Sequence, residues 1–339
     1  MTATAPREVR LAKRPEGWPK DSDFELAQSE PRDLQDGEIR VRNIAMSVDP
    51  YMRGRMNDRK SYAPPYEIGK AMWGGAVGEV VESKDPTISV GQSVGHEFGW
   101  REESIVSGNE TRPIDTTVVS YSAYLGVLGM PGQTAYVGLT RIMQINEGDI
   151  FFVSGAAGAV GSVAGQIAKI LGASKVIGSA GSPEKVAYVK GELDFDEVFN
   201  YHDGPVAEQL AKAAPDGIDC YFDNVGTEHL EAAIGALRLH GRIALCGSIS
   251  TYNDVEPKPG PRNVSTLVGN RGRMEGFIVR DHEDIAAEYW KRAAGWLEDG
   301  SLKTRETFVD GIDNAAAAFV TMLKGGNTGK MIVRLQDLL

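Results

Sequence analysis

A glycine-rich turn is the segment whose residue types and spacing most clearly suggest chemistry. GAAGAVG at 155–161 follows the apolar run IFFVS, and apolar residues then recur at helical spacing from Val160 to Leu171. In this context Gly158 would let the backbone approach a pyrophosphate, and Gly161 would let the helix pack closely on the strand. The first turn of the helix would offer free N–H groups and a positive dipole end to the phosphates. The pattern predicts dinucleotide binding; the alternative is a tight turn in an ordinary α/β domain.

The second expected strand indicates which dinucleotide is bound. NAD sites place an acidic residue near the end of this strand to hold the ribose 2′-hydroxyl. Here the segment is GSAGSPEK, which has no acid before Glu184, and Glu184 would lie in the first turn of the next helix. Ser182 and Lys185 are instead suited to a 2′-phosphate. The segment favours NADP(H), with Lys185 as a solvated helix lysine being the alternative.

Histidine and cysteine spacing gives no support for a metal site. A catalytic zinc needs about three protein ligands, and no cysteine precedes Cys220. His96 in GHEFG is the nearest approach to a ligand motif, and we expect it to be a surface or pocket-edge histidine. The remaining histidines have no ligand spacing, and Cys220 and Cys246 read as buried free thiols.

A scaffold must hold these candidate groups in place, and the hydrophobic pattern predicts that it has two domains. Short strand-like segments with glycine bends dominate the first 125 or so residues and indicate a β-rich, barrel-like domain. Strand and helix patterns then alternate, which predicts a doubly wound parallel sheet. Its expected strands are 150–154, 175–180, 197–200, 218–222, 242–246 and 273–279. Helices are expected at 283–300, with Gly300 as its cap, and at 313–326, starting on an Asp313 cap. We place the first domain at 1–124 and the second at 125–310, with 311–339, including a strand at 329–335, returning to the first.

Composition narrows the class of protein. The chain has 339 residues and a net charge of −11, which disfavours a general nucleic-acid binder. There is no apolar stretch long enough for a transmembrane helix, and the N-terminus lacks the apolar core of a signal peptide. We therefore expect a cytoplasmic protein with no membrane partner.

Several long motifs, in order along nearly the whole chain, resemble one family. They are SVDPYMRGRM (47–56), LGMPGQTAY (128–136), GAAGAVGSVAGQIAK (155–169), GSAGSPEKV (179–186), DGIDCYFDNVG (216–226), GRIALCGSISTYN (241–253) and LKGGNTGK (323–330). The chain resembles the zinc-independent branch of the medium-chain dehydrogenase/reductase superfamily, which holds leukotriene/prostaglandin reductases, 2-alkenal reductases and curcumin reductases. The resemblance implies an α/β fold with a GroES-like β-barrel domain, a Rossmann domain and NADPH as cofactor.

The resemblance also implies where the cofactor and substrate lie. Tyr51 in DPYMR matches a tyrosine of the substrate pocket, whereas Gly269 stands near the place of a tyrosine found in some mammalian members. The prostaglandin-like form of the substrate pocket is therefore not expected to carry over. Together with the residue-level reading, the motifs assign these residues to the cofactor: Gly158, Ala159, Val160, Gly161, Ser162, Ser182, Lys185, Tyr201, Asn224, Cys246, Gly247, Ser248, Ile249, Ser250, Thr251, Tyr252, Phe277, Ile278, Val279 and Asn327.

The expected reaction is reduction of a conjugated carbon–carbon double bond. Without zinc, direct carbonyl reduction lacks its usual Lewis acid, whereas an enone accepts hydride at the β-carbon and spreads the charge into an enolate. That oxyanion needs a hydrogen-bond donor. Tyr51 is the protein candidate, with Tyr62, Tyr66 and a cofactor ribose hydroxyl as alternatives, and Tyr51 as a packing residue is also open. A quinone reductase and a cofactor-binding protein without enzymatic activity are the other functions to test. The resemblance and the apolar 273–279 segment, as a sheet edge, also predict a homodimer.

Overall fold

The computed structural model describes residues 5–117 and 119–336. Residues 1–4, 118 and 337–339, which belong to the predicted first domain, lie outside the described residues. The chain divides into two compact units: unit 1 comprises Met1–Leu125 and Glu306–Leu339, and unit 2 comprises Gly126–Arg305. The chain therefore leaves unit 1 and returns to it after unit 2.

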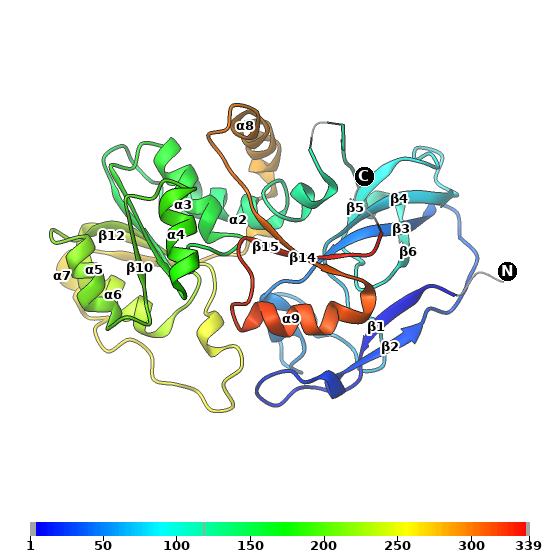
Figure 1. The fold of residues 1–339 in the computed structure, drawn as a ribbon, viewed down its shortest axis with the longest axis horizontal. Helices are drawn as coiled ribbons and strands as arrows, with labels where there is room; N and C mark the ends of the chain where they lie inside the picture. The colour runs from blue at the N-terminus through cyan, green and yellow to red at the C-terminus, as the bar shows by residue number, and fades with distance from the viewer. Residues whose placement is uncertain (1–4, 118, 337–339) are drawn as a thin grey trace. The chain divides into compact units, whose positions relative to one another are not determined.

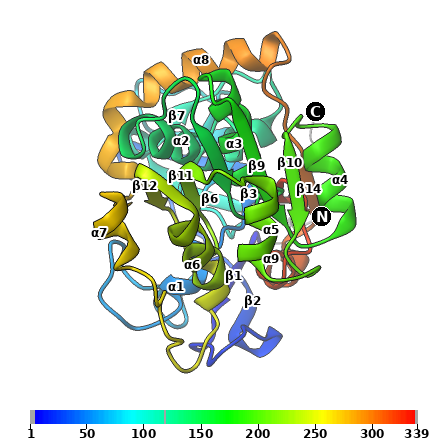
Figure 2. The same ribbon diagram turned by 90° about the vertical axis from the view of Figure 1, so that its left-hand side faces the viewer.

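Unit 2 is built on a parallel six-stranded sheet, as the alternating pattern predicted. The strands are β8 (Ile150–Val153), β9 (Lys175–Ala180), β10 (Glu197–Asn200), β11 (Ile218–Asp223), β12 (Leu237–Leu245) and β13 (Arg273–Gly276). Their order is β10-β9-β8-β11-β12-β13, and every neighbouring pair is parallel. Figure 2 labels four of these strands, β9 to β12. The carboxyl ends of all six strands thus meet at one edge, where ligands bind in such sheets.

Helices pack on both faces of this sheet. They are α2 (Met130–Val137), α3 (Gly161–Ile170), α4 (Pro183–Gly191), α5 (Val206–Ala213), α6 (Thr227–Ala236), α7 (Thr266–Asn270) and α8 (Ala286–Glu298), with a π-helical turn at Gly138–Ile142 and 3-10 turns at Ile249–Thr251 and Val279–Ile285. On one face Tyr221 of β11 packs with Val206 of α5 and Ala233 of α6. On the other face Phe222 fills the space beside Gly138, where a side chain would not fit. Neighbouring residues of β11 are therefore buried on opposite sides, which explains the consecutive apolar residues Cys220–Phe222.

Several boundaries differ from those expected. β12 begins at Leu237, directly after α6, rather than at residue 242. β13 ends at Gly276, so Phe277 and Ile278 lie beyond the sheet. The helix expected at 283–300 begins only at Ala286 and ends at Glu298, because Val279–Ile285 forms a 3-10 turn with a non-helical His282 inside it.

Unit 1 contains a two-stranded and a seven-stranded sheet. The small one pairs β1 (Arg7–Leu11) with β2 (Phe24–Gln28). The larger one runs β14 (Glu306–Asp310), β15 (Lys330–Arg334), β3 (Glu38–Ser47), β4 (Ala76–Ser83), β5 (Ser93–His96) and β7 (Arg112–Pro113), and β6 (Glu103–Ser107) pairs with β3. The described residues of unit 1 also form two helices, α1 (Tyr51–Arg55) and α9 (Ala315–Leu323), and 3-10 turns at Asp21–Asp23, Gly108–Glu110, Tyr121–Leu125 and Ile312–Asn314.

The C-terminal segment supplies two strands of the larger sheet (Figure 1). β15 pairs antiparallel with β3 and parallel with β14, a strand that the sequence pattern did not indicate. The predicted cap of α9 was wrong: Asp313 lies within the 3-10 turn and pairs with Arg7, and Asn314 is the residue before the helix. α9 buries Phe319 against the rings of Phe24 and Trp100 in the core of this unit. Within residues 5–117 and 119–336, no helix is long and apolar enough to cross a membrane.

Candidate cofactor and substrate site

The glycine-rich turn has the backbone geometry that a phosphate site requires. Gly155 adopts a positive φ of 63°, and Ala156 N–H donates to Ser179 O at 2.9 Å, which ties the turn to β9. A side chain on Gly161 would collide with the carbonyl oxygen of Gly155. Within unit 2, the N–H groups of Ala159 and Val160 have no acceptor. These groups are available to an anionic ligand at the start of α3.

The residues expected to select NADP lie at the adjacent strand end. Ser182 is the N-cap of α4, and its Oγ accepts from Lys185 N at 3.3 Å. Partial burial lowers the pKa of Lys185, because the ammonium has lost solvent. Glu184 lies in the first turn of α4, as predicted. Backbone and Ser182 hydrogen bonds lower the pKa of Glu184, which fits an ordinary helix-start carboxylate.

Tyr201 lies beside the same strand end. A Cβ added to Gly181 would be 2.6 Å from the Tyr201 hydroxyl, so this ring borders the segment that carries Ser182. The Tyr201 ring contacts His202 and, edge to face at 5.3 Å between ring centroids, His229 of α6. His229 is buried, and its Nε2 has no partner among the described residues. Sequence reasoning did not single out His229, since it stands in an otherwise ordinary amphipathic helix.

A buried polar network shapes the next strand end. Asp223 Oδ1 accepts from Tyr221 OH at 2.7 Å, Gly226 N at 2.8 Å and Val225 N at 3.0 Å. Burial raises the pKa of Asp223, and these donors oppose the shift. Asn224 Nδ2 donates to Ser154 O at 2.9 Å, and Asn224 N donates to Ser154 Oγ at 3.0 Å. The network therefore fixes the loop after β11 to the end of β8.

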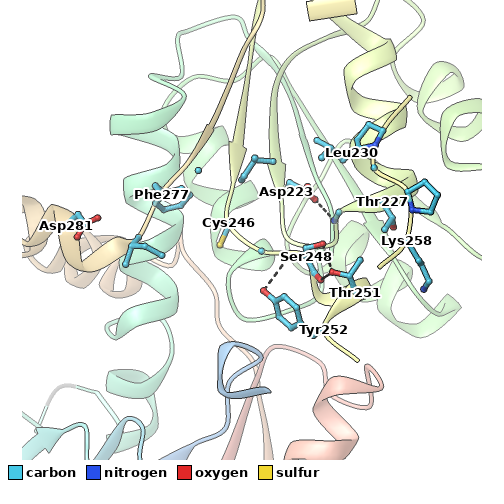
Figure 3. A pocket seen from close by; sticks show the side chains of 18 residues that line it. Asp223, Thr227, Leu230, Cys246, Ser248, Thr251, Tyr252, Lys258, Phe277 and Asp281 are labelled. Carbon is cyan, nitrogen blue, oxygen red and sulfur yellow. Dashed lines mark hydrogen bonds between the residues drawn. The ribbon is translucent and has the colours of Figure 1, made fainter. Parts of the chain in front are cut away.

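A pocket of about 690 Å³ opens at the carboxyl ends of β11, β12 and β13 (Figure 3). Of the residues assigned to the cofactor, those lining this pocket are Cys246, Gly247, Ser248, Thr251, Tyr252, Phe277 and Ile278. Ile249, Ser250 and Val279 do not line it, and Ser250 Oγ instead donates to Val225 O. The pocket also includes Asp223 and the Lys258–Pro261 loop.

Hydrogen bonds hold the pocket wall in shape. Ser248 N donates to the Tyr252 hydroxyl at 3.2 Å, and the hydroxyls of Ser248 and Thr251 lie 3.0 Å apart (Figure 3). Cys246 is partly exposed as a residue, yet protein surrounds its thiol closely enough that lost solvation raises the pKa of this thiol to about 12. The thiol therefore stays protonated at neutral pH and is a poor nucleophile.

The candidate tyrosines in unit 1 have different environments. The hydroxyl of Tyr66 donates to Trp73 O at 2.6 Å, and Tyr62 is exposed. Tyr51 begins α1 and packs against the core, yet its hydroxyl has no hydrogen-bond partner among the described residues. Burial raises the pKa of Tyr51 well above its usual value, so the hydroxyl remains a hydrogen-bond donor.

Asn327, which the motifs assign to the cofactor, lies in unit 1, as does Arg55, which sequence reasoning did not single out. Asn327 stands in the turn before β15, where its Nδ2 donates to Gly329 O at 2.7 Å. Arg55, one helical turn after Tyr51, lies over the Trp73 ring at 3.4 Å from the centroid.

His96 is neither a surface nor a pocket-edge residue, so that expectation was wrong. It is buried at 5% exposure, its Nε2 lies 2.9 Å from Asn43 Oδ1, and its Nδ1 accepts from Phe98 N at 3.0 Å. Burial lowers the pKa of His96 to about 3. Both ring nitrogens are thus engaged in structural contacts. Within the described parts of the chain, no group of three or more His, Cys, Asp or Glu side chains is placed to hold a metal.

The cysteines also differ in part from the expectation. Cys220 lies buried in β11, whereas Cys246 follows β12 and is only partly buried.

Comparison with known proteins places this geometry in a family. Residues 7–114 match a family described as the N-terminal domain of oxidoreductase, and residues 159–296 match one described as zinc-binding dehydrogenase. The chain is 40% identical to the NADPH-dependent curcumin reductase of Escherichia coli over 96% of this chain and 95% of that protein. It is 42% identical to prostaglandin reductase 1 of Rattus norvegicus over 96% of this chain and 97% of that protein.

A solved structure agrees with the sequence relatives. CurA from Vibrio vulnificus, determined in complex with NADPH, is 41% identical and superposes with a TM-score of 0.92, covering 98% of this chain and 99% of that chain. The motifs, the two-part fold and these relatives lead to one conclusion: the chain belongs to the medium-chain dehydrogenase/reductase superfamily, in the branch of the prostaglandin, 2-alkenal and curcumin reductases.

Proposed function

We propose that this protein is an NADPH-dependent reductase of the conjugated carbon–carbon double bond in α,β-unsaturated ketones and aldehydes. Two features together carry the proposal. The glycine-rich turn offers backbone N–H groups to a phosphate, and the Tyr51 hydroxyl has no hydrogen-bond partner among the described residues. The relatives named for curcumin and prostaglandin reduction support the same reaction class.

The residues present suit NADPH. The unengaged N–H groups of Ala159 and Val160 can hold a pyrophosphate, and Lys185 with Ser182 can receive the 2′-phosphate. Asn224 and Tyr201 would line the nucleotide. The pocket wall from Cys246 to Tyr252, together with Phe277, would hold the nicotinamide end. When bound, the cofactor supplies the hydride that the β-carbon of the enone accepts.

The protein itself must stabilise the negative charge that develops on the substrate oxygen. Negative charge develops there as the double bond is reduced, and a fixed donor stabilises it more than water does. Tyr51 can donate a hydrogen bond to this oxygen. Its hydroxyl stays protonated because burial raises its pKa. Tyr66 is a poorer candidate, since its hydrogen is already given to Trp73 O.

Product analysis tests the proposal. Purified protein is incubated with NADPH and 3-nonen-2-one, and the products are separated by gas chromatography. The saturated ketone is expected, and an allylic alcohol as main product would overturn the proposed reaction. Activity is expected to survive exhaustive chelation with EDTA, because no metal takes part in the proposed chemistry.

A quinone reductase of the same superfamily is the alternative carried from the sequence. A parallel assay with 1,4-benzoquinone separates the enone reductase from the quinone reductase, because the kcat/KM values for the enone and the quinone can be compared directly. We expect the enone to be preferred. Failure to consume NADPH with any acceptor would favour a non-enzymatic cofactor-binding protein.

We also propose that the protein is a homodimer. β13 is an edge strand of the unit 2 sheet, and the nearby segment exposes Val264 and Val268 at 43% and 82%. An unpaired edge strand can pair with the identical edge of a second copy, and the exposed valines before it would be covered in such a dimer. Light scattering at micromolar concentration is expected to give twice the mass of one chain.

A further inference from the structure

A buried ion pair joins the two sequence segments that make up unit 1. Lys330 Nζ lies 2.8 Å from Asp49 Oδ1 and donates at 2.8 Å to Val48 O, and the two side chains are 5% and 7% exposed. The second carboxylate oxygen of Asp49 accepts from Ser47 Oγ. Both oxygens of this carboxylate are therefore held by partners that cannot exchange freely with water.

The pair stands where β3 passes into the helix that carries Tyr51. β15 begins at Lys330 and pairs Ile332 with Ser47, so continuing this antiparallel register places Lys330 opposite Asp49. Asp49 O accepts from Met52 N at 3.1 Å, which makes Asp49 part of the first turn around Tyr51. The side chain and the backbone of Asp49 thus link Lys330 directly to the start of α1.

Stability alone is a weak reason for this arrangement. Removing a lysine and a carboxylate from water is costly, and apolar replacements of buried ion pairs are often as stable. A buried ion pair instead fixes the positions of its two side chains, because each charge keeps its partner in only one arrangement. A displacement of about 1 Å at a reacting group can reduce a rate by about 10²-fold.

We infer that Lys330 is a positioning residue that acts through Asp49 to fix the Tyr51 hydroxyl for enolate stabilisation. This inference rests on the proposed function, since it requires Tyr51 to be the donor. Lys330 itself does not contact the reacting atoms, and its effect on the rate passes entirely through Tyr51.

A double-mutant cycle tests the link. Lys330→Met, Tyr51→Phe and the double variant are compared with the wild type by kcat for 3-nonen-2-one, well below each variant's Tm. Lys330→Met is expected to lower kcat at least tenfold in the wild-type background. In the Tyr51→Phe background it is expected to change kcat by less than twofold, because the hydroxyl that it positions is already absent.

Arg242→Met provides the matched control. Arg242 pairs with Asp149 in unit 2, with side-chain exposures of 17% and 10%, and the substitution likewise leaves a buried carboxylate without its cation. It is expected to lower Tm without a tenfold loss of kcat. A comparable loss of kcat in this control would show that general destabilisation explains the effect, which would overturn the inference.

The remaining outcomes are also decisive. If the fold-loss of kcat in the double variant equals the product of the two single losses, Lys330 acts independently of Tyr51, and the positioning role is overturned. Equal kcat in wild type and Tyr51→Phe would overturn it as well, while a saturated ketone in the same assay would leave the proposed reaction standing. If Lys330→Met does not fold, Asp49→Asn enters the same cycle. This variant keeps an oxygen facing Lys330 but removes the charge, and a kcat loss that vanishes in Tyr51→Phe supports the inference.

Discussion

The carbonyl oxygen of Gly155 occupies the space in which a side chain on Gly161 would begin. Gly158 is different, because the one atom of the described residues within 4 Å of an added Cβ is Gly155 O at 3.2 Å. The two glycines of the turn therefore serve different purposes. Gly161 allows the start of α3 to pack closely against the turn, and Gly158 leaves room for a ligand.

Substituting each glycine by alanine should separate these purposes. Gly161→Ala should reduce the free energy of unfolding by about 1–3 kcal/mol, because the helix must move away from the turn. Gly158→Ala should leave Tm nearly unchanged and raise the KM for NADPH about tenfold or more. Thermal unfolding and cofactor titration measure the two effects. A stable Gly161→Ala variant would contradict the assignment.

Lys185→Ala should weaken NADPH binding and leave NADH binding nearly unchanged. A charge-assisted hydrogen bond to the 2′-phosphate contributes roughly 1.5–3 kcal/mol, or about 10- to 150-fold in affinity. Lys190→Ala is the control, since Lys190 lies on the same helix and pairs with Glu197 at the surface. Fluorescence titration with both cofactors measures the affinities, and a wild type that prefers NADH would show that the 178–185 segment has been misread.

Tyr51→Phe should lower kcat and kcat/KM together for an enone. The substitution keeps the packed ring and removes only the donor, so the loss reflects a bond made in the transition state. A single oxyanion donor contributes up to about 10²–10³-fold. Steady-state kinetics measure the loss, and a fall nearer tenfold would indicate that a cofactor hydroxyl shares the stabilisation. Tyr66→Phe is the comparison, and its smaller expected effect follows from its bond to Trp73 O.

His229 should make the protein less stable in acid. Burial lowers the pKa of His229 to about 4 from an ordinary value of 6.5. The unfolded chain therefore binds a proton that the folded chain does not, and stability falls as the pH decreases from about 6.5 to 4. This contribution amounts to about 3 kcal/mol. His96, with a pKa of about 3, adds to the same trend.

His229→Phe tests this contribution. The Nε2 has no partner among the described residues, so an apolar ring of similar size should be tolerated at pH 7. The free energy of unfolding, measured in urea at pH 7 and pH 4.5, should fall less in the variant than in the wild type. An identical decrease in both proteins would show that His229 is protonated freely in the folded state.

Much of the fold could be predicted because strands buried on both faces appear in the sequence as short, nearly continuous apolar runs. The run at 150–153 is wholly apolar, the run at 218–222 is interrupted only by Asp219, and both are strands of the parallel sheet. β14, with the sequence ETFVD, was missed because it is short, mixed in polarity and paired with β15, a strand more than 20 residues further along the chain.

The site could be predicted only where one segment carries the chemistry. The glycine-rich turn is local, so its residues were found together. The network of Ser154, Tyr221 and Asp223 was not, since it forms between strands about 70 residues apart in the sequence. His96 was misjudged for the same reason, because its partner Asn43 lies on a distant strand.

The return of the chain to unit 1 has a consequence for biosynthesis. Unit 2 is continuous, so all of its residues have been translated before residues 330–334 are made. Until then, Ala45–Ser47 lacks its β15 partner, and Asp49 lacks the lysine that holds it. A nascent chain can therefore complete its Rossmann sheet early, whereas the surroundings of Tyr51 are finished only after residues 330–334 have been translated.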